Sequence, residues 1–116
     1  MSDCIFCKNL PKALENDLAY AIYDISPISK GHTLLIPKRH FELIFEASPQ
    51  EIASLFDLLN KMKTVLQKEH KPDGYNIWVN CGRVAGQIVM HSHLHLIPRY
   101  TGQVIHIKDH LKGNIE

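Results

Sequence analysis

The stretch Val89-Met90-His91-Ser92-His93-Leu94-His95-Leu96-Ile97-Pro98-Arg99 places three histidines at alternate positions. Successive side chains of an extended strand point to opposite faces, so we expect His91, His93 and His95 to share one face. The leucines between and after them then point the other way, toward a hydrophobic core. Three ionisable rings on one side of a half-buried strand are costly as packing alone, and they indicate chemistry on that face.

One long amphipathic helix is predicted before this strand. The run Ser48-Pro49-Gln50-Glu51 is typical of a helix start, because it offers an N-cap serine, a proline at the first helical position and a glutamate that closes a capping box. The run Pro72-Asp73-Gly74 ends the helix. Between these signals the apolar residues recur at helical spacing, at Ile52, Leu55, Phe56, Leu59, Met62 and Leu66.

The remaining pattern predicts a sheet. Strands are expected over residues 18–25 (ending at Asp24), 32–36 (stopped by Pro37), 75–79 and 90–97, with a glycine-containing loop over residues 82–87. The order of strands, helix and strands indicates an α+β fold, a mostly antiparallel sheet with the long helix packed on one face. The helix would cover the leucine face of the histidine strand and leave the histidines on the open face or at its edge.

Composition limits the class of protein. A chain of 116 residues suits one compact domain, predicted here to span residues 1–116. A net charge of +1 provides no basic field for nucleic acid, and the longest apolar runs are too short to span a bilayer. The first residues lack the basic region of a signal peptide, and three cysteines are too few for a disulfide scaffold. We therefore expect a cytoplasmic protein with neither a nucleic-acid nor a membrane partner.

The histidine face allows two kinds of chemistry. A rise of about 3.3 Å per residue separates the Cα atoms of His91 and His95 by about 13 Å, too far for both to join one metal ion easily. Neighbouring histidines could still share an ion with a third ligand from elsewhere. Alternatively, a neutral imidazole with a pKa near ~6.5 can attack phosphorus, and the glycine loop can supply backbone N–H donors for the phosphate. A row of surface histidines, or a pH-sensitive patch, is the alternative without catalysis.

The run His91–Ile97 resembles the signature of the histidine-triad (HIT) family, His-x-His-x-His followed by two apolar residues. Residues 23–27, 30–40 and 85–87 also resemble segments of that family in the family's order. Residues 97–100 resemble the ending of bacterial-type members. The chain is therefore identified as similar to Hint-like, bacterial-type HIT proteins from Cys4 to about Gly102.

The resemblance implies a nucleotide hydrolase or nucleotidyl transferase. Such enzymes cleave a bond at the α-phosphate of purine nucleoside phosphoramidates or dinucleoside polyphosphates. His93 would form a covalent nucleotidyl-histidine, His95 would hydrogen-bond the phosphate, and Gln87 would be the third catalytic residue. Asp24, whose two oxygens suit a vicinal diol, would hold the ribose. The implied substrate contacts come from Asp24, Ile25, Asn80, Gly86, Gln87, His93 and His95. A homodimer without an organic cofactor is also implied.

This chain departs from the family pattern at three places. Ile88 stands where many members carry a serine or threonine after Gly-Gln, so a hydroxyl that can assist the phosphate or leaving group is missing. The stretch between Cys7 and Asp24 is shorter than in many Hint-like relatives, which affects the base pocket. The tail after Tyr100 is short and generic.

Cys4-Ile5-Phe6-Cys7 is half of a zinc site by its spacing. A thioredoxin-like redox pair and two ordinary buried cysteines are the alternatives. The candidate partners for a zinc site with two cysteines and two histidines are His40 and His91, and the resemblance implies the same use of the first triad histidine. A closed site of four ligands would be structural, and it would leave His93 free to react.

Two other functions stay open at the level of sequence. One is a mononuclear zinc hydrolase in which His93, His95 and another group hold the metal. The other is a non-catalytic module that binds nucleotides or a protein partner, and the apolar Ile88 gives this alternative some weight.

Overall fold

The structure is a computed structural model that describes residues 3–103, so both ends of the predicted domain lie outside the described residues. Its sheet has the strand order β1-β2-β3-β5-β4, and each neighbouring pair is antiparallel. The strands are β1 (Leu14–Glu15), β2 (Ala19–Tyr23), β3 (Thr33–Pro37), β4 (Gly74–Trp78) and β5 (Leu94–Arg99). The helices are η1 (Ile5–Cys7), η2 (Ile44–Glu46), α1 (Pro49–His70) and η3 (Arg83–Ala85). The predicted α+β class is confirmed.

The helix α1 begins and ends where its signals predict. The backbone N–H of Glu51 donates to Oγ of Ser48 at 3.1 Å, and Ser48 N–H donates to the Glu51 carboxylate at 2.8 Å, which completes the capping box. Lys71 ends the helix in the left-handed region, with φ of 51°. None of the helices in the described part is both long and apolar enough to cross a lipid bilayer.

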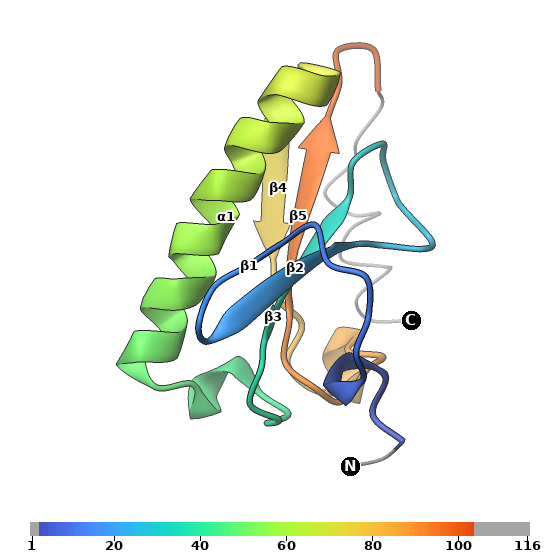
Figure 1. The fold of residues 1–116 in the computed structure, drawn as a ribbon. Coiled ribbons are helices and arrows are strands. Elements are labelled where there is room, and N and C mark those ends of the chain that lie inside the picture. Colours follow the sequence, from blue (N-terminus) through green and yellow to red (C-terminus); the bar gives the residue numbers. More distant parts are fainter. Residues whose placement is uncertain (1–2, 104–116) are drawn as a thin grey trace.

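The sheet is covered on both faces (Figure 1). On one face α1 packs its buried side chains, including Leu55, Met62 and Leu66, against Leu94 and Leu96 of β5. The leucine face of the histidine stretch is therefore the helix side, as predicted. On the other face a smaller cluster joins Phe6, Tyr20, Leu34 and Ile36, so the N-terminal segment with η1 lies on the side opposite α1. Each fully buried leucine or isoleucine contributes about 1.5–3 kcal/mol.

The histidine strand is shorter than the predicted 90–97, because β5 starts only at Leu94. Its neighbour β3 ends at Pro37, which has no N–H to continue the ladder. Beyond that point Ser92 N–H donates to the carbonyl of Phe41 at 2.7 Å, so residues before Leu94 bond to the loop after β3 instead of to β3 itself. His91 and His93 thus precede the strand. The rings still follow one another on the side of Phe6, with centroids 5.1 Å apart between His93 and His95.

Candidate functional site

Four side chains from three distant segments meet beside η1. The Sγ of Cys4 and the Nδ1 of His91 are 3.3 Å apart, as are the Sγ of Cys7 and the Nδ1 of His40. The two histidine Nδ1 atoms lie 3.1 Å apart. All four potential ligand atoms lie within 4.8 Å of one another. The four residues that the sequence suggested for zinc are therefore brought together.

The donor set fits a zinc ion. Two thiolates and two imidazoles are common ligands of structural zinc, and a tetrahedral ion with bonds of about 2.1–2.3 Å separates its ligands by about 3.4–3.8 Å. The observed separations of 3.1–3.6 Å between the sulfur and nitrogen atoms are close to this range. Nε2–H of His91 donates to the carbonyl of Pro37 at 2.7 Å, which leaves Nδ1 with a lone pair for the metal.

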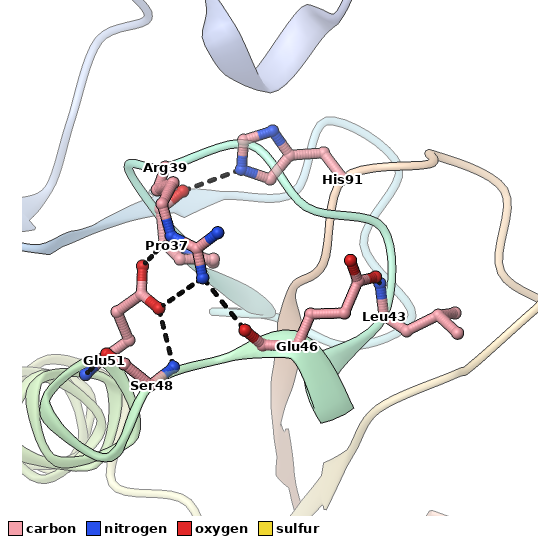
Figure 2. A network of polar contacts seen from close by, with 7 residues as sticks. All are labelled: Pro37, Arg39, Leu43, Glu46, Ser48, Glu51 and His91. Carbon is pink, nitrogen blue, oxygen red and sulfur yellow. Dashed lines mark hydrogen bonds and ion pairs between the residues drawn. The ribbon is translucent and has the colours of Figure 1, made fainter.

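The segment that carries His40 is held by an ion pair between the exposed Arg39 and the buried Glu51 at the start of α1 (Figure 2). Arg39 donates to both carboxylate oxygens of Glu51, at 3.0 and 2.8 Å, and to the carbonyl of Glu46 at 3.0 Å. Hydrogen bonds from Arg39, together with those from Ser48, lower the pKa of Glu51 to about 2. The capping box of α1 thus also fixes the loop that presents His40.

His93 is buried, with 9% of its surface exposed, and is oriented for attack through one nitrogen. Its Nδ1–H donates to the carbonyl of His91 at 2.8 Å, so the lone pair lies on Nε2. Burial lowers the pKa of His93, which keeps the ring neutral at physiological pH. Both groups of potential metal ligands within residues 3–103 omit His93. A neutral, unligated imidazole is the form that nucleophilic catalysis needs.

His95 is set up as a hydrogen-bond donor by a residue that the sequence interpretation left without a role. Ile28 N–H donates to Nδ1 of His32 at 3.1 Å, so the proton of His32 lies on Nε2. That Nε2–H donates to Nδ1 of His95 at 3.0 Å, which leaves His95 with a proton on its own Nε2. Burial, followed by the charges of His93 and His32, lowers the pKa of His95 to about 3.

The sequence contained a weak signal for His32. It lies two residues before Leu34, which pairs with His95 across β3 and β5. A period of two therefore puts His32 on the same face and close to His95. Without the register of the two strands, however, the pairing of these two histidines could not be deduced.

Asp24 lies at the end of β2, beside this histidine chain. Its Oδ1 accepts a hydrogen bond from Ser26 N–H at 2.9 Å, and its Oδ2 lies 3.6 Å from Nε2 of His32. Asp24, His32 and His95 are close enough to form a second group of potential metal ligands. The bond from Ile28 argues against a metal there, because His32 would need lone pairs on both ring nitrogens.

Gln87 is buried and uses its whole side chain inside the glycine loop. Its Oε1 accepts from Gly82 N–H at 2.8 Å, and its Nε2 donates to the carbonyls of Glu42 and Val89 at 2.7 and 3.1 Å. This loop turns at Gly82 and Gly86, whose φ values of 95° and 93° favour glycine. Gln87 therefore ties the loop to the segment that carries His40. A direct contact between its side chain and phosphate stays a prediction.

Two other predicted contact residues lie at the rim of the site. The Nδ2 of Asn80 donates to the carbonyl of Gly86 at 3.3 Å, which joins β4 to the glycine loop. Ile25 is 99% exposed next to Asp24, so its whole side chain is available to a ligand. Ile88, which follows Gln87, is 84% exposed and presents an apolar surface where a hydroxyl was expected from the resemblance.

Comparisons with known proteins agree with this site. A family model described as the HIT domain matches residues 10–102. The chain is 36% identical over 104 residues to adenylylsulfatase HINT3 of Arabidopsis thaliana, covering 84% of this chain and only 53% of that protein, about half its length. It is 40% identical over 102 residues to adenosine 5'-monophosphoramidase hnt1 of Schizosaccharomyces pombe, covering 83% of this chain and 74% of that one. The crystal structure of a Zn-bound histidine triad family protein from Mycobacterium smegmatis is similar with a TM-score of 0.81 and 29% identity, over 97% of this chain and 88% of that one.

Proposed function

Because the chain belongs to the histidine-triad (HIT) family, we propose that it is a nucleotide hydrolase or nucleotidyl transferase that works through a covalent nucleotidyl-His93. Its substrates would be purine nucleoside phosphoramidates or dinucleoside polyphosphates. The S. pombe relative, named for adenosine 5'-monophosphoramidase activity, supports the first class. The observation that carries the proposal is the neutral ring of His93, whose Nδ1–H is held by the His91 carbonyl and whose Nε2 therefore carries the lone pair.

The first step forms the covalent intermediate. The lone pair on Nε2 of His93 attacks the α-phosphorus, an N–P bond forms, and the bond from phosphorus to the leaving group breaks. The leaving group departs with that electron pair and takes a proton from solvent. The His91 carbonyl keeps the proton on Nδ1 throughout and stabilises the positive charge that develops on the ring. Nε2–H of His95 would donate to a phosphate oxygen.

The second step releases the product. Water attacks the same phosphorus, the N–P bond breaks, and His93 recovers its neutral form. A nucleoside monophosphate leaves, and the proton from the water returns to solvent. The neutral state of His95, with its pKa near 3, suits a role as a fixed donor in both steps rather than as a proton carrier.

The remaining contacts would select the nucleotide. Asp24 would accept hydrogen bonds from the two ribose hydroxyls, because each of its oxygens has lone-pair capacity left after its bond to Ser26 or its approach to His32. Ile25 would contact the nucleoside. Asn80, Gly86 and Gln87 would shape the phosphate and leaving-group side, and Gln87 would act by holding the glycine loop in place.

We also propose that Cys4, Cys7, His40 and His91 hold a structural zinc ion. The donor set and its spacing support this, as does the Zn-bound M. smegmatis neighbour. When bound, the ion would supply a cross-link between the N-terminal segment, the β3–α1 loop and the histidine stretch. We also propose a cytoplasmic location, because three cysteines are too few for the disulfide scaffold of a small secreted protein.

Self-association is a further proposal, since the family resemblance implies a homodimer. The edge strand β4 supports it, because its outer side has no partner strand within residues 3–103 and its Ile77 is 50% exposed. Sedimentation should give twice the chain mass of 13.3 kDa. A monomer at micromolar concentration would contradict this.

Trapping of the covalent intermediate tests the proposed function. The protein is mixed with adenosine 5'-phosphoramidate, quenched in alkali, where phosphohistidine survives, and analysed by mass spectrometry. We expect a nucleotide adduct on His93 in the wild type. His93→Ala should lose the adduct and turnover, at least 10³-fold in kcat, while it still binds adenosine monophosphate. His70→Ala, a histidine at the C-terminal end of α1, is the matched control.

The same experiment separates the other functions. Binding without adduct or turnover in the wild type would indicate a non-catalytic module, for which the apolar surface of Ile88 is the supporting observation. Turnover that survives in His93→Ala would exclude the covalent route. A mononuclear zinc hydrolase would be favoured by two results together. The metal-stripped protein would stay folded but lose turnover, and the zinc-loaded protein would turn over without forming an adduct.

A further inference from the structure

Phe6 lies between the two cysteines of the metal cluster, defined here as Cys4, Cys7, His40 and His91. It is the buried residue of η1, with 6% of its surface exposed, and it packs with Tyr20, Leu34 and Ile36. The hydroxyl of Tyr20 donates to its backbone carbonyl. Both the backbone and the side chain of Phe6 are therefore directed onto the sheet, although its neighbour Ile5 is largely exposed.

The ring of Phe6 touches both the metal cluster and the proposed nucleophile. Its centroid lies 5.9 Å from that of His91, with the planes at 82°, and 5.1 Å from that of His93, with the planes at 74°. Both arrangements are edge-to-face, the geometry that aromatic pairs prefer. Phe6 is thus in contact with a metal ligand and with the reacting ring at the same time.

Two further contacts of the His93 ring are seen within residues 3–103. It makes an edge contact with His95 on one side, with centroids 5.1 Å apart, and one hydrogen bond from Nδ1 to the His91 carbonyl. Phe6 supplies the contact on the η1 side. A shift of Phe6 would therefore let the imidazole rotate, and its Nε2 would lose its fixed direction.

The position of Phe6 depends in turn on the metal cluster. The element η1 is a single helical turn with two backbone hydrogen bonds. Cys7 N–H donates to the carbonyl of Cys4 at 3.1 Å, and Lys8 N–H donates to the carbonyl of Ile5 at 3.3 Å. A one-turn 3₁₀-helix has little stability of its own. Ligation of Cys4 and Cys7 would fix both of its ends. Without that ligation, Phe6 would be held by the small cluster on the sheet, by the hydrogen bond from Tyr20 and by its ring contacts, while the backbone on either side of it would be loose.

We propose that Phe6 is a positioning residue, through which the metal cluster holds the ring of His93 in its reactive orientation. This proposal goes beyond a structural role for zinc. Its prediction about kcat rests on the proposed function. It assigns to the Cys-x-x-Cys turn a control over catalysis. A metal-free protein would still bind nucleotide but would present a mobile nucleophile.

The test is a cycle of four samples: wild type and Phe6→Leu, each loaded with zinc and each stripped with a chelator. At one fixed pH, ¹H–¹⁵N correlations of the His93 ring report its tautomer, and kcat and the Kd for adenosine monophosphate are measured beside them. Ile5→Val is the matched control in the same turn. Thermal unfolding followed by circular dichroism verifies that each sample is folded.

In the wild type we expect stripping to lower kcat at least tenfold, to change the Kd less than twofold, and to convert the single Nδ1–H tautomer of His93 into a mixture. The zinc-loaded Phe6→Leu protein should already have the low kcat and the mixture of His93 tautomers. Removal of zinc from this variant should then change kcat less than twofold. Ile5→Val should behave like the wild type. An equal effect of stripping on wild type and Phe6→Leu would overturn the proposal, as would an unchanged His93 spectrum in the stripped wild type.

The spectra keep this test separate from the proposed function. A loaded wild type that forms no adduct would reject the covalent mechanism, yet the tautomer of His93 would still respond to the metal if Phe6 transmits its state. If Phe6→Leu does not fold, Cys7→Ser and Cys81→Ser are compared after identical chelator treatment and partial reloading with zinc. Cys7→Ser should then resemble the stripped wild type and Cys81→Ser the loaded one. A loaded-type His93 spectrum in metal-free Cys7→Ser would reject the proposal.

Discussion

At the scale of single residues, three identical side chains acquire different chemistry from the partner of one ring nitrogen. His91 donates from Nε2 to Pro37, so its Nδ1 is available to a metal. His93 donates from Nδ1 to a carbonyl, so its Nε2 carries the lone pair that we propose as the nucleophile. Nδ1 of His95 accepts from His32, so its Nε2 carries a proton. The hydrogen bonds, and not the residue type, therefore divide the work among the histidines.

The ribose role of Asp24 leads to a prediction about substrate selection. Asp24→Asn keeps the size of the side chain but replaces a charged acceptor, so the proposed bonds to the two hydroxyls weaken. We expect KM for an adenosine phosphoramidate to rise about tenfold, or about 1.4 kcal/mol, with kcat changed much less. The same measurement on a 2',3'-dideoxy substrate is the control, because it lacks the diol. An equal rise for both substrates would argue against the ribose contact.

At the scale of elements, the segment between β3 and α1 connects the parts of the site. It provides His40 to the metal cluster, and the carbonyl of Phe41 accepts from Ser92 beside the nucleophile. The carbonyl of Glu42 accepts from Gln87, which holds the glycine loop. The bidentate pair of Arg39 and Glu51 anchors this segment to the first turn of α1 (Figure 2).

That ion pair gives a prediction about stability. Glu51→Gln keeps an oxygen for Ser48 N–H but removes the charge that faces Arg39. Because the Glu51 side chain is only 6% exposed while that of Arg39 is 55% exposed, we expect a loss of about 1–3 kcal/mol in the free energy of unfolding. Urea denaturation at pH 7 measures it. Glu46→Gln is the control, since Arg39 contacts only the backbone carbonyl of Glu46.

The pH dependence of this pair has a definite sign. The pKa of Glu51 is lowered to about 2 from 4.5, so its contribution is complete above about pH 4.5 and is lost as the pH falls toward 2. The difference between wild type and Glu51→Gln should therefore shrink in acid. A difference that stays constant from pH 7 to pH 3 would mean that the charge does not stabilise the fold.

The elements were predictable to different degrees. The start of α1 was fixed by local chemistry at Ser48 and Glu51, and the structure confirms it. The start of β5 was wrong by four residues, since it depends on where β3 runs out of donors at Pro37, a non-local fact. The short strand β1 was not predicted. The cysteine and histidine cluster followed from spacing and resemblance, whereas His32 needed the strand register to be found.

At the scale of the whole molecule, the sheet separates two apolar clusters, and three histidines are buried, His32, His91 and His93. The larger one lies under α1 and the smaller one under the N-terminal segment. The histidines are on the side of the smaller cluster, where burial lowers the pKa values of His32, His91, His93 and His95. Because burial disfavours the charged form, the fold keeps these imidazoles neutral at physiological pH.

This arrangement predicts that the protein loses stability in weak acid. The pKa of His95 falls from 6.5 to about 3 on folding, so below pH 6.5 the unfolded chain binds a proton that the folded chain does not. Stability should decrease steadily from pH 6.5 toward pH 3, at about 1.4 kcal/mol per pH unit for this one group. Chemical denaturation across this range measures the slope.

A substitution identifies the residue responsible. His95→Asn removes the titrating group, so the slope between pH 6.5 and pH 4 should become shallower. His70→Asn, at the end of α1, should keep the wild-type slope. Equal slopes in all three proteins would show that other groups govern the acid unfolding.

His91 belongs to the metal cluster and also orients His93, the proposed nucleophile, since its ring offers Nδ1 to the cluster while its carbonyl accepts from His93. The consequence is a constraint on how this sequence can change during evolution. Under the proposed function, a lineage derived from this chain that lost its cysteines would keep its rate only if another interaction took over the support of residue 91. Ancestral gain or loss of the Cys-x-x-Cys pair should therefore travel together with changes in the neighbours of that histidine.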